Sequence, residues 1–361
     1  MSNGKPTVIV TGISGFLGQS LIRRLGGDFA IVGFDVVEPQ PAAPQPDLFI
    51  EVDLTADESV REALGKVEQR FGPRIASAIH LAAYFDLSGE DDPKYEAVNV
   101  GGTERLLRGL QRLQLEQVVL ASTMLVHAPV GPEERIDEER PLEPKMPYER
   151  SKVACERLVR ELRGPAKAVQ LRLAGIYDDS CKAPFIANQI ALIFERSIKS
   201  HLYPGDLRTG QSFLHVGDFA EAVHRLVTRR ERLPEETALL LGEPEALTHG
   251  DLQDRIGQLL HGKDWRTLEV PQTVAKVGAM IENQVRPTQP FIKPWMVDFA
   301  EATYALDIGR ARALLDWEPQ RRLAASLPSM VEALRADPRG WYERHGLDPR
   351  RVPGSAEKRK G

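Results

Sequence analysis

The stretch Val8-Ile9-Val10-Thr11-Gly12-Ile13-Ser14-Gly15-Phe16-Leu17-Gly18 decides the fold. An apolar run leads directly into three glycines at intervals of three, and an amphipathic helical pattern follows with Leu21, Ile22 and Leu25 on one face. Glycines at these positions let the backbone turn tightly, come close to a diphosphate and pack the helix against the strand. Because N–H groups at a helix start attract anions, strand, turn and helix together predict a dinucleotide-binding unit.

Short apolar runs alternate with helical patterns through the first two-thirds of the 361 residues. We expect strands at residues 7–10, 30–34, 48–52, 75–81, 117–121 and 168–173, with amphipathic helices between them. Near-continuous apolar strands separated by helices are typical of a parallel sheet covered on both faces. The predicted fold is therefore α/β, a doubly wound, Rossmann-like parallel sheet.

The pattern changes after residue 173, where proline-interrupted helical segments replace the regular alternation. We expect a dinucleotide-binding domain over residues 1–175, completed by about 212–242. A smaller, mostly helical substrate lobe is expected over 176–211 and 243–335. The basic segment 350–361 predicts a flexible tail.

Charge, cysteine content and hydropathy exclude several classes of protein. Lys and Arg number 47 and Asp and Glu 52, a net charge of −5, so nucleic acid is not an expected partner. Cys155 and Cys181 are the only cysteines, which excludes a disulfide framework, and since the histidines show no ligand spacing we expect no metal. No apolar run reaches the ~18 residues of a membrane span, and the polar start leaves no room for a signal peptide. We expect a soluble, cytoplasmic protein without membrane association.

Asp35 stands at the end of the second predicted strand, 17 residues after Gly18. A carboxylate there accepts hydrogen bonds from the ribose hydroxyls of an adenosine and repels a 2′-phosphate. No Arg or Lys occurs between Arg24 and Arg61 to bind such a phosphate, so the sequence favours NAD over its phosphorylated relative. The alternative is a carboxylate that merely ends a strand, and the preceding glycines disfavour it. Asp53 is a weaker candidate, placed to reach the adenine amine.

A phenol and an ammonium lie four residues apart at Tyr148 and Lys152, and on a helix they share one face. A tyrosine that titrates near ~10 is a poor base, and we expect the lysine to lower its pKa, which suits proton exchange with a substrate hydroxyl. Thr123 follows the strand at 117–121 and would orient the substrate oxygen from the ligand crevice. The alternatives are a surface pair for Tyr148 and Lys152 and a strand-end cap for Thr123.

Further motifs in the same order along the chain complete a family pattern. Over about residues 7–320 the chain resembles the extended short-chain dehydrogenase/reductases, specifically the NAD-dependent epimerase/dehydratase family. The motifs that carry the resemblance are Thr11-Gly12-x-x-Gly15-Phe16-Leu17-Gly18, Asp53-Leu54, His80-Leu81-Ala82-Ala83, Asn99-Val100-x-Gly102-Thr103, Ser122-Thr123, Tyr148-x-x-x-Lys152, Phe213-Leu214-His215-Val216-x-Asp218 and Asp307-x-x-Arg310-Ala311…Trp317-x-Pro319.

The resemblance implies roles for individual residues. Thr123, Tyr148 and Lys152 would form the catalytic set, and Tyr148 and Lys152 would also contact the cofactor. The residues that would line NAD besides these two are Gly12, Gly15, Phe16, Leu17, Gly18, Asp35, Asp53, Leu54, Leu81, Ala82, Ala83 and Asn99. Relatives are commonly homodimers that pair through the helices beginning near Asn99 and Tyr148.

Several positions depart from the family pattern and narrow the choice of substrate. Gly175 and Gln211 replace an Asn and an Arg that hold sugar nucleotides in epimerases, and Arg208, Arg286 or Lys293 would have to substitute for a second Arg anchor. A buried diphosphate needs charged donors, so these losses disfavour a nucleotide-sugar substrate.

Other departures concern the reacting groups. Met124-Leu125 replace the Asp-Glu pair of the dehydratases, which removes the acid and base for loss of water. His127 replaces a usual Tyr, and Asp178 a usual Gly; we expect His127 to be packed or at the surface.

The sequence thus predicts an NAD-dependent oxidoreductase that acts on a secondary alcohol or the matching ketone, with Tyr148 as the acid–base group. The first alternative is a sugar-nucleotide 4-epimerase, in which bound NAD oxidises the sugar transiently. The second is an NAD-binding scaffold without chemistry. The expected partners are a small-molecule substrate and a second copy of the chain. The apolar segment 270–296 favours a compact or partly apolar substrate.

Overall fold

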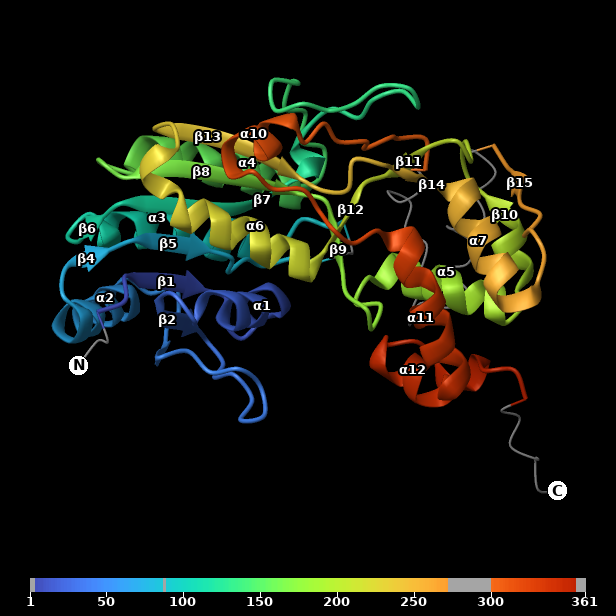
Figure 1. Ribbon diagram of the computed structural model, residues 1–361, viewed down its shortest axis with the longest axis horizontal. Coiled ribbons are helices and arrows are strands. Elements are labelled where there is room, and N and C mark those ends of the chain that lie inside the picture. The colour runs from blue at the N-terminus through green and yellow to red at the C-terminus, as the bar shows by residue number, and fades with distance from the viewer. Residues whose placement is uncertain (1–3, 87–88, 272–299, 355–361) are drawn as a thin grey trace.

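A seven-stranded parallel sheet forms the centre of the computed structural model, which describes residues 4–86, 89–271 and 300–354 (Figure 1). The strand order is β13-β8-β7-β5-β1-β2-β3, and each neighbouring pair is parallel. In chain order these strands are β1 (Thr7–Thr11), β2 (Ala30–Asp35), β3 (Leu48–Glu51), β5 (Ser77–His80), β7 (Gln117–Thr123), β8 (Lys167–Leu173) and β13 (Glu236–Leu241). The predicted doubly wound sheet is confirmed.

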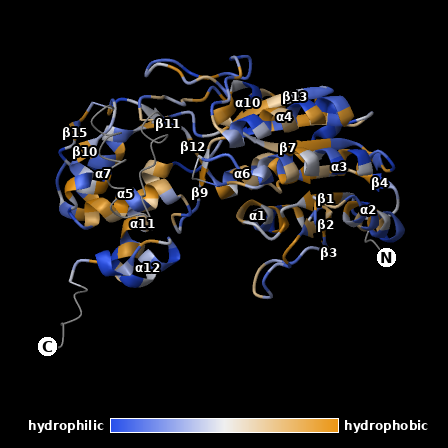
Figure 2. Cartoon of the chain, turned by 180° about the vertical axis from the view of Figure 1, so that it is seen from behind, coloured by the Kyte–Doolittle hydropathy of each residue, from blue (hydrophilic) through white to orange (hydrophobic). Residues whose placement is uncertain are grey.

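Helices cover both faces of the sheet because alternate strand residues point to opposite sides, and both sides are apolar. Val8 and Val10 of β1 pack in one core with α1, α6 and α10, whereas Ile9 packs in another with α2 and α3. Figure 2 shows this apolar interior along the strands. The covering helices are α1 (Phe16–Leu25), α2 (Asp57–Phe71), α3 (Gly101–Leu110), α4 (Pro147–Leu162), α6 (Val216–Thr228) and α10 (Gly309–Leu315).

A mostly helical lobe lies beside the carboxyl ends of the central strands (Figure 1). Its helices share a core that includes Tyr177, Ile190 and Trp341. They are α5 (Pro184–Phe194), α7 (His249–His261), α11 (Leu323–Ala336) and α12 (Pro338–Arg344). None of the helices in the described ranges has the length and apolar character that a bilayer crossing requires.

Short elements connect these parts. The short strands are β4 (Arg74–Ile75), β6 (Gln114–Leu115), β9 (Gly175–Tyr177), β10 (Leu202–Tyr203), β11 (Gly210–Gln211), β12 (Phe213–His215), β14 (Leu247–Thr248) and β15 (Leu268–Glu269). The short helical turns are η1 (Tyr95–Val100), η2 (Met124–Val126), η3 (Ile198–His201), η4 (Arg230–Arg232) and η5 (Pro349–Arg351). The run 75–81, expected as one strand, is divided between β4 and β5, and only β5 joins the sheet.

The two cores show which segments pack together. Tyr304, Leu306 and Trp317 pack with the sheet although they fall within the segment assigned to the lobe from sequence. Trp341 extends the lobe core beyond residue 335. Within the expected tail, Arg351 pairs with Glu195 at 2.9 Å, and residues 355–361 lie outside the described ranges.

Candidate active site

The glycine turn lies where the strand order reverses, between β1 and β5 at the carboxyl edge of the sheet. Crevices at such a reversal are where open α/β sheets bind ligands. Gly12 has φ +73°, and a Cβ there would lie 2.8 Å from the backbone nitrogen of Ala82. A Cβ on Gly18 would collide with the backbone of Gly12 and Ile13. Only glycine therefore fits at these two positions, because neighbouring backbone occupies the space of a side chain.

The Asp35 carboxylate is fixed beside this turn. One of its oxygens accepts a hydrogen bond from the Ser14 N–H at 3.0 Å, and the other accepts one from the Val36 N–H at 2.8 Å. Both bonds orient the carboxylate at the end of β2, next to the start of α1. This is the position that recognition of an adenosine ribose requires.

A buried hydrogen-bonded chain joins β1, β5 and α3 beneath the crevice. The Thr11 hydroxyl is 2.7 Å from His80 Nδ1 and accepts from the Ala82 N–H at 3.1 Å, while His80 Nε2 is 3.0 Å from the Thr103 hydroxyl. Burial lowers the pKa of His80 to about 3, so the imidazole is neutral at physiological pH. The chain fixes the backbone of Ala82, which faces Gly12.

Asn99 is buried and uses its amide to hold two segments together. Its carbonyl oxygen accepts from the Tyr84 N–H at 2.6 Å, and its nitrogen donates to the Tyr84 carbonyl at 3.0 Å and to the Ser151 hydroxyl at 3.0 Å. Asn99 thereby ties the segment after Ala83 to α4. Its amide positions the site from beneath.

Tyr148 and Lys152 lie one turn apart at the start of α4, as their spacing predicts. Lys152 Nζ donates to the Ala121 carbonyl at 2.9 Å and lies 5.7 Å from the centroid of the Tyr148 ring. The Tyr148 ring also packs edge-on against Phe85, with 4.7 Å between centroids. The pair is therefore set beside the end of β7, where Thr123 also lies.

Burial dominates the proton affinity of this pair. It raises the pKa of the Tyr148 phenol, with smaller contributions from Cys155 and Tyr95, and it lowers the pKa of Lys152. The expectation that Lys152 lowers the tyrosine pKa is therefore wrong for this structure. Its ammonium binds the Ala121 carbonyl, and burial of the phenol is the largest cause of the raised tyrosine pKa.

Thr123 is buried at the end of β7 and caps η2. Its hydroxyl oxygen accepts from the Leu125 N–H at 3.3 Å, so the strand-end cap considered from sequence is present. An accepting hydroxyl still has its proton to donate. Thr123 can thus cap the turn and donate to a substrate oxygen.

A buried ion pair that the sequence patterns do not predict lies beneath the site. Arg172 Nη2 is 2.9 Å from Glu156 Oε2, and both side chains are buried. Ser122, next to Thr123, donates to Glu156 Oε1 at 2.6 Å, and Arg172 Nη1 is 3.0 Å from His127 Nε2. His127 is fully buried, in agreement with the expected packed histidine. In the sequence, this ion pair is indicated by an arginine, Arg172, within a largely apolar strand.

The comparisons with known proteins agree with this geometry. The NAD dependent epimerase/dehydratase family matches residues 8–242. The chain belongs to this family. It is therefore an NAD-dependent enzyme of the short-chain dehydrogenase/reductase type. The glycine turn fits that cofactor because α1 begins after Gly15 with no side-chain cap on its N–H groups, which favours an anion there.

Proteins similar to this family member include a short-chain dehydrogenase/reductase and a UDP-glucose 4-epimerase. It is 25% identical to short-chain dehydrogenase/reductase family 42E member 1 of Mus musculus, over 94% of this chain and 88% of that protein. It is 26% identical to a UDP-glucose 4-epimerase of Mycolicibacterium smegmatis, over 91% and 98%. The fold matches the Thermus thermophilus UDP-glucose 4-epimerase in complex with NAD, with TM-score 0.64, 23% identity and coverage of 92% and 99%.

The remaining residues expected to line the cofactor differ in their surroundings: some are packed against the glycine turn or α3, and Asp53 is exposed. Ala82 faces Gly12, and Leu54 packs against Gly102 of α3. Asp53 is exposed and accepts from the Thr55 N–H and hydroxyl, a contact that orders the turn before α2. The others flank the same edge: Phe16 and Leu17 begin α1, and Leu81 and Ala83 follow β5.

The positions that replace the sugar-nucleotide anchors and the dehydratase acid carry no charge. Gly175 packs against Phe213, Gln211 lies in β11 opposite Leu247, and Met124 is buried. Arg208 is exposed and pairs with Asp206 at 2.6 Å. The other two substitutes, Arg286 and Lys293, and the apolar segment up to residue 296 lie outside the described residues. Within the described ranges, no cluster of three or more His, Cys, Asp or Glu could hold a metal.

Proposed function

We propose that this enzyme transfers hydride between NAD and the carbon of a secondary alcohol or ketone, with Tyr148 as the acid–base group. NAD supplies the hydride acceptor or donor when bound. The observation that carries the proposal is the placement of Tyr148, Lys152 and Thr123 around the carboxyl ends of β5 and β7. Tyr148 exchanges a proton with the substrate oxygen, Thr123 donates a hydrogen bond to it, and Lys152 binds the nicotinamide ribose.

The proposed cofactor site runs along the carboxyl edge of the sheet. The diphosphate lies on the turn from Gly12 to Gly18, and Asp35 accepts from the adenosine ribose. Asp53 and Leu54 flank the adenine. Leu81, Ala82, Ala83 and Asn99 form the wall between the turn and α4. The substrate pocket lies between this edge and the helical lobe, consistent with the expected division into a cofactor domain and a substrate lobe.

A non-nucleotide substrate is proposed because the described positions expected to anchor a sugar-nucleotide diphosphate offer no unpaired cation. Gly175 and Gln211 provide no cation, and Arg208 is already paired with Asp206. Met124 and Leu125 provide neither acid nor base for elimination of water. These features favour simple oxidation or reduction of a compact substrate.

The second candidate is a sugar-nucleotide 4-epimerase, favoured by 26% identity to a UDP-glucose 4-epimerase over 98% of that protein. Net redox change separates the two functions. The purified enzyme with NAD should accumulate NADH on a panel of secondary alcohols. Interconversion of UDP-sugars with no net NADH would instead establish the epimerase. If neither occurs while NAD binds, the chain is a non-catalytic scaffold.

We also propose a cytoplasmic homodimer that pairs through η1 and α4. A surface hollow of about 580 Å³ lies between them and offers space for a partner's side chains. Its lining includes Pro93, Val100, Pro147 and Ala154. Cytoplasmic location is consistent with two buried, unpaired cysteines. Light scattering after size exclusion should give twice the mass of the chain, and Ala154→Arg should give the monomer.

A further inference from the structure

The loop between β9 and α5 has a fixed conformation organised by Asp178, one of the positions that departs from the family pattern. Asp178 Oδ1 accepts from the Ser180 N–H at 3.0 Å, from the Ser180 hydroxyl at 2.8 Å and from the Lys182 N–H at 2.9 Å. Cys181, between them, is fully buried with φ +67°. A cysteine in this left-handed region is strained, so the contacts of the loop must offset this conformational energy to keep its shape.

This shape brings the side chain of Lys182 to the glycine turn. Lys182 Nζ lies 4.9 Å from the centroid of the Phe16 ring. Phe16 is the first residue of α1 and directly follows Gly15. Figure 1 shows the loop descending from β9 toward the end of α1 that faces the lobe. A cation from the substrate side of the molecule thus lies beside the backbone that receives the cofactor.

The glycine turn has no cation of its own. The basic residues of α1, Arg23 and Arg24, lie in its last turn. A helix rises 1.5 Å per residue, so they are about 10 Å along the axis from the start of α1. The N–H groups and dipole of the helix start favour an anion, but they neutralise about half a charge, whereas a diphosphate carries about two. Among the described residues, Lys182 brings its ammonium to the Phe16 ring at this end of α1.

We propose that Lys182 binds the diphosphate of NAD, and that Asp178 positions it by fixing the loop. The ammonium donates hydrogen bonds to the phosphate oxygens from the side opposite the helix N-terminus. Because the loop continues directly into α5, bound NAD also fixes the start of a helix of the substrate lobe. The inference requires the cofactor but no particular substrate, so it goes beyond the proposed function.

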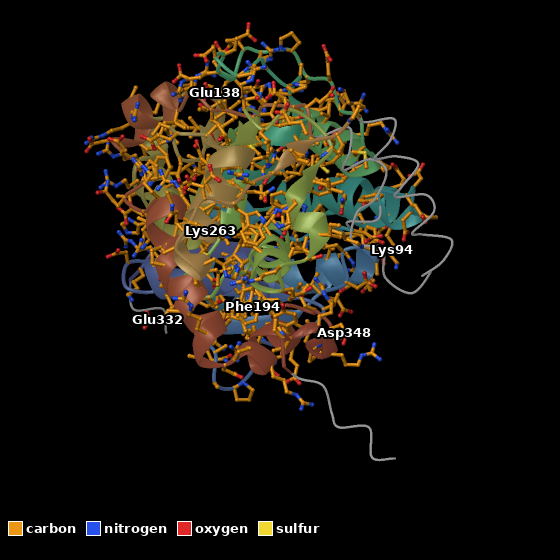
Figure 3. The ribbon with its side chains drawn as sticks, turned by 90° about the vertical axis from the view of Figure 1, so that its right-hand side faces the viewer. Lys94, Glu138, Phe194, Lys263, Glu332 and Asp348 are labelled. Atoms are coloured by element: carbon orange, nitrogen blue, oxygen red, sulfur yellow. The ribbon has the colours of Figure 1, made fainter. Side chains whose placement is uncertain are left out.

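The test is NAD binding to the full-length protein, measured by calorimetry without substrate at low and moderate salt. Lys182→Gln should raise the Kd for NAD about tenfold, the loss of one charge-assisted hydrogen bond, and should flatten its salt dependence. Lys182→Arg should restore most of the affinity. The matched control is Lys263→Gln, an exposed lysine of the lobe labelled in Figure 3, which should bind NAD as the parent does.

Two further measurements separate this role from others. ADP-ribose retains the diphosphate and lacks nicotinamide, so Lys182→Gln should weaken it as much as NAD. Asp178→Ala should weaken NAD in the parent and add little in the Lys182→Gln background, because both act through one contact. An unchanged Kd for NAD in Lys182→Gln overturns the proposal. A loss confined to uridine diphosphate would also overturn it and assign the lysine to a substrate anion. Neither result bears on turnover, which tests the proposed function separately.

Discussion

Arg172→Met should destabilise the protein severely because it leaves a carboxylate buried without its cation. Glu156 is fully buried, and of its side-chain hydrogen bonds to Ser122 and Arg172 only the one from Ser122 remains after the change. Removing one partner of a buried ion pair costs about 3–5 kcal/mol. At about 2 °C per kcal/mol for a chain of this size, the melting temperature should fall by roughly 6–10 °C.

Differential scanning calorimetry of the parent, Arg172→Met and Arg172→Met/Glu156→Gln tests this reasoning. The double variant has no buried charge and should recover a large part of the lost stability. If Arg172→Met melts within about 1 °C of the parent, the ion pair of Arg172 and Glu156 does not stabilise the fold beneath Thr123 and Lys152.

Other substitutions probe the cofactor site and the acid–base group. Gly18→Ala should abolish measurable NAD binding, because its Cβ would collide with backbone carbonyls, whereas Gly65→Ala in α2, with open space around it, should bind NAD normally and gain about 0.5–1 kcal/mol of stability. Asp35→Ala should weaken NAD and improve the ratio of NADP to NAD affinity at least tenfold, which parallel titrations would show; an unchanged ratio contradicts the ribose contact. Since burial raises the pKa of Tyr148, alcohol oxidation should accelerate by up to about tenfold per pH unit between pH 7 and 9, while ketone reduction, which uses the protonated phenol, should not; a flat oxidation profile would refute Tyr148 as the base.

The parts of the site that depend on local sequence could be predicted. The turn from Gly12 to Gly18 and the pair of Tyr148 and Lys152 follow from spacing along one strand–helix junction and one helix. The parallel, doubly wound sheet and the helical lobe also followed, since apolar periodicity and β–α alternation decide them. Asp35 was placed correctly beside the turn because both flank neighbouring parallel strands.

Features that depend on distant contacts could not be predicted. Glu156 and Arg172 stand 16 residues apart, and only the packing of α4 on β7 and β8 shows that they meet. The sign of the Tyr148 pKa shift depends on burial by Phe85 and Tyr95, which come from a separate segment. Lys182 lacks any motif, and its approach to Phe16 exists only because the Asp178 loop folds back toward α1.

The most direct test of the account compares Tyr148→Phe with the parent in NAD binding and in single-turnover NADH formation on an alcohol substrate. The phenylalanine retains the ring contacts with Phe85 and removes only the ionisable hydroxyl. We expect a Kd for NAD within about twofold of the parent and a hydride-transfer rate at least about 10²-fold lower. A variant that forms NADH at the parent rate would contradict the assignment of Tyr148 as the proton-transfer group.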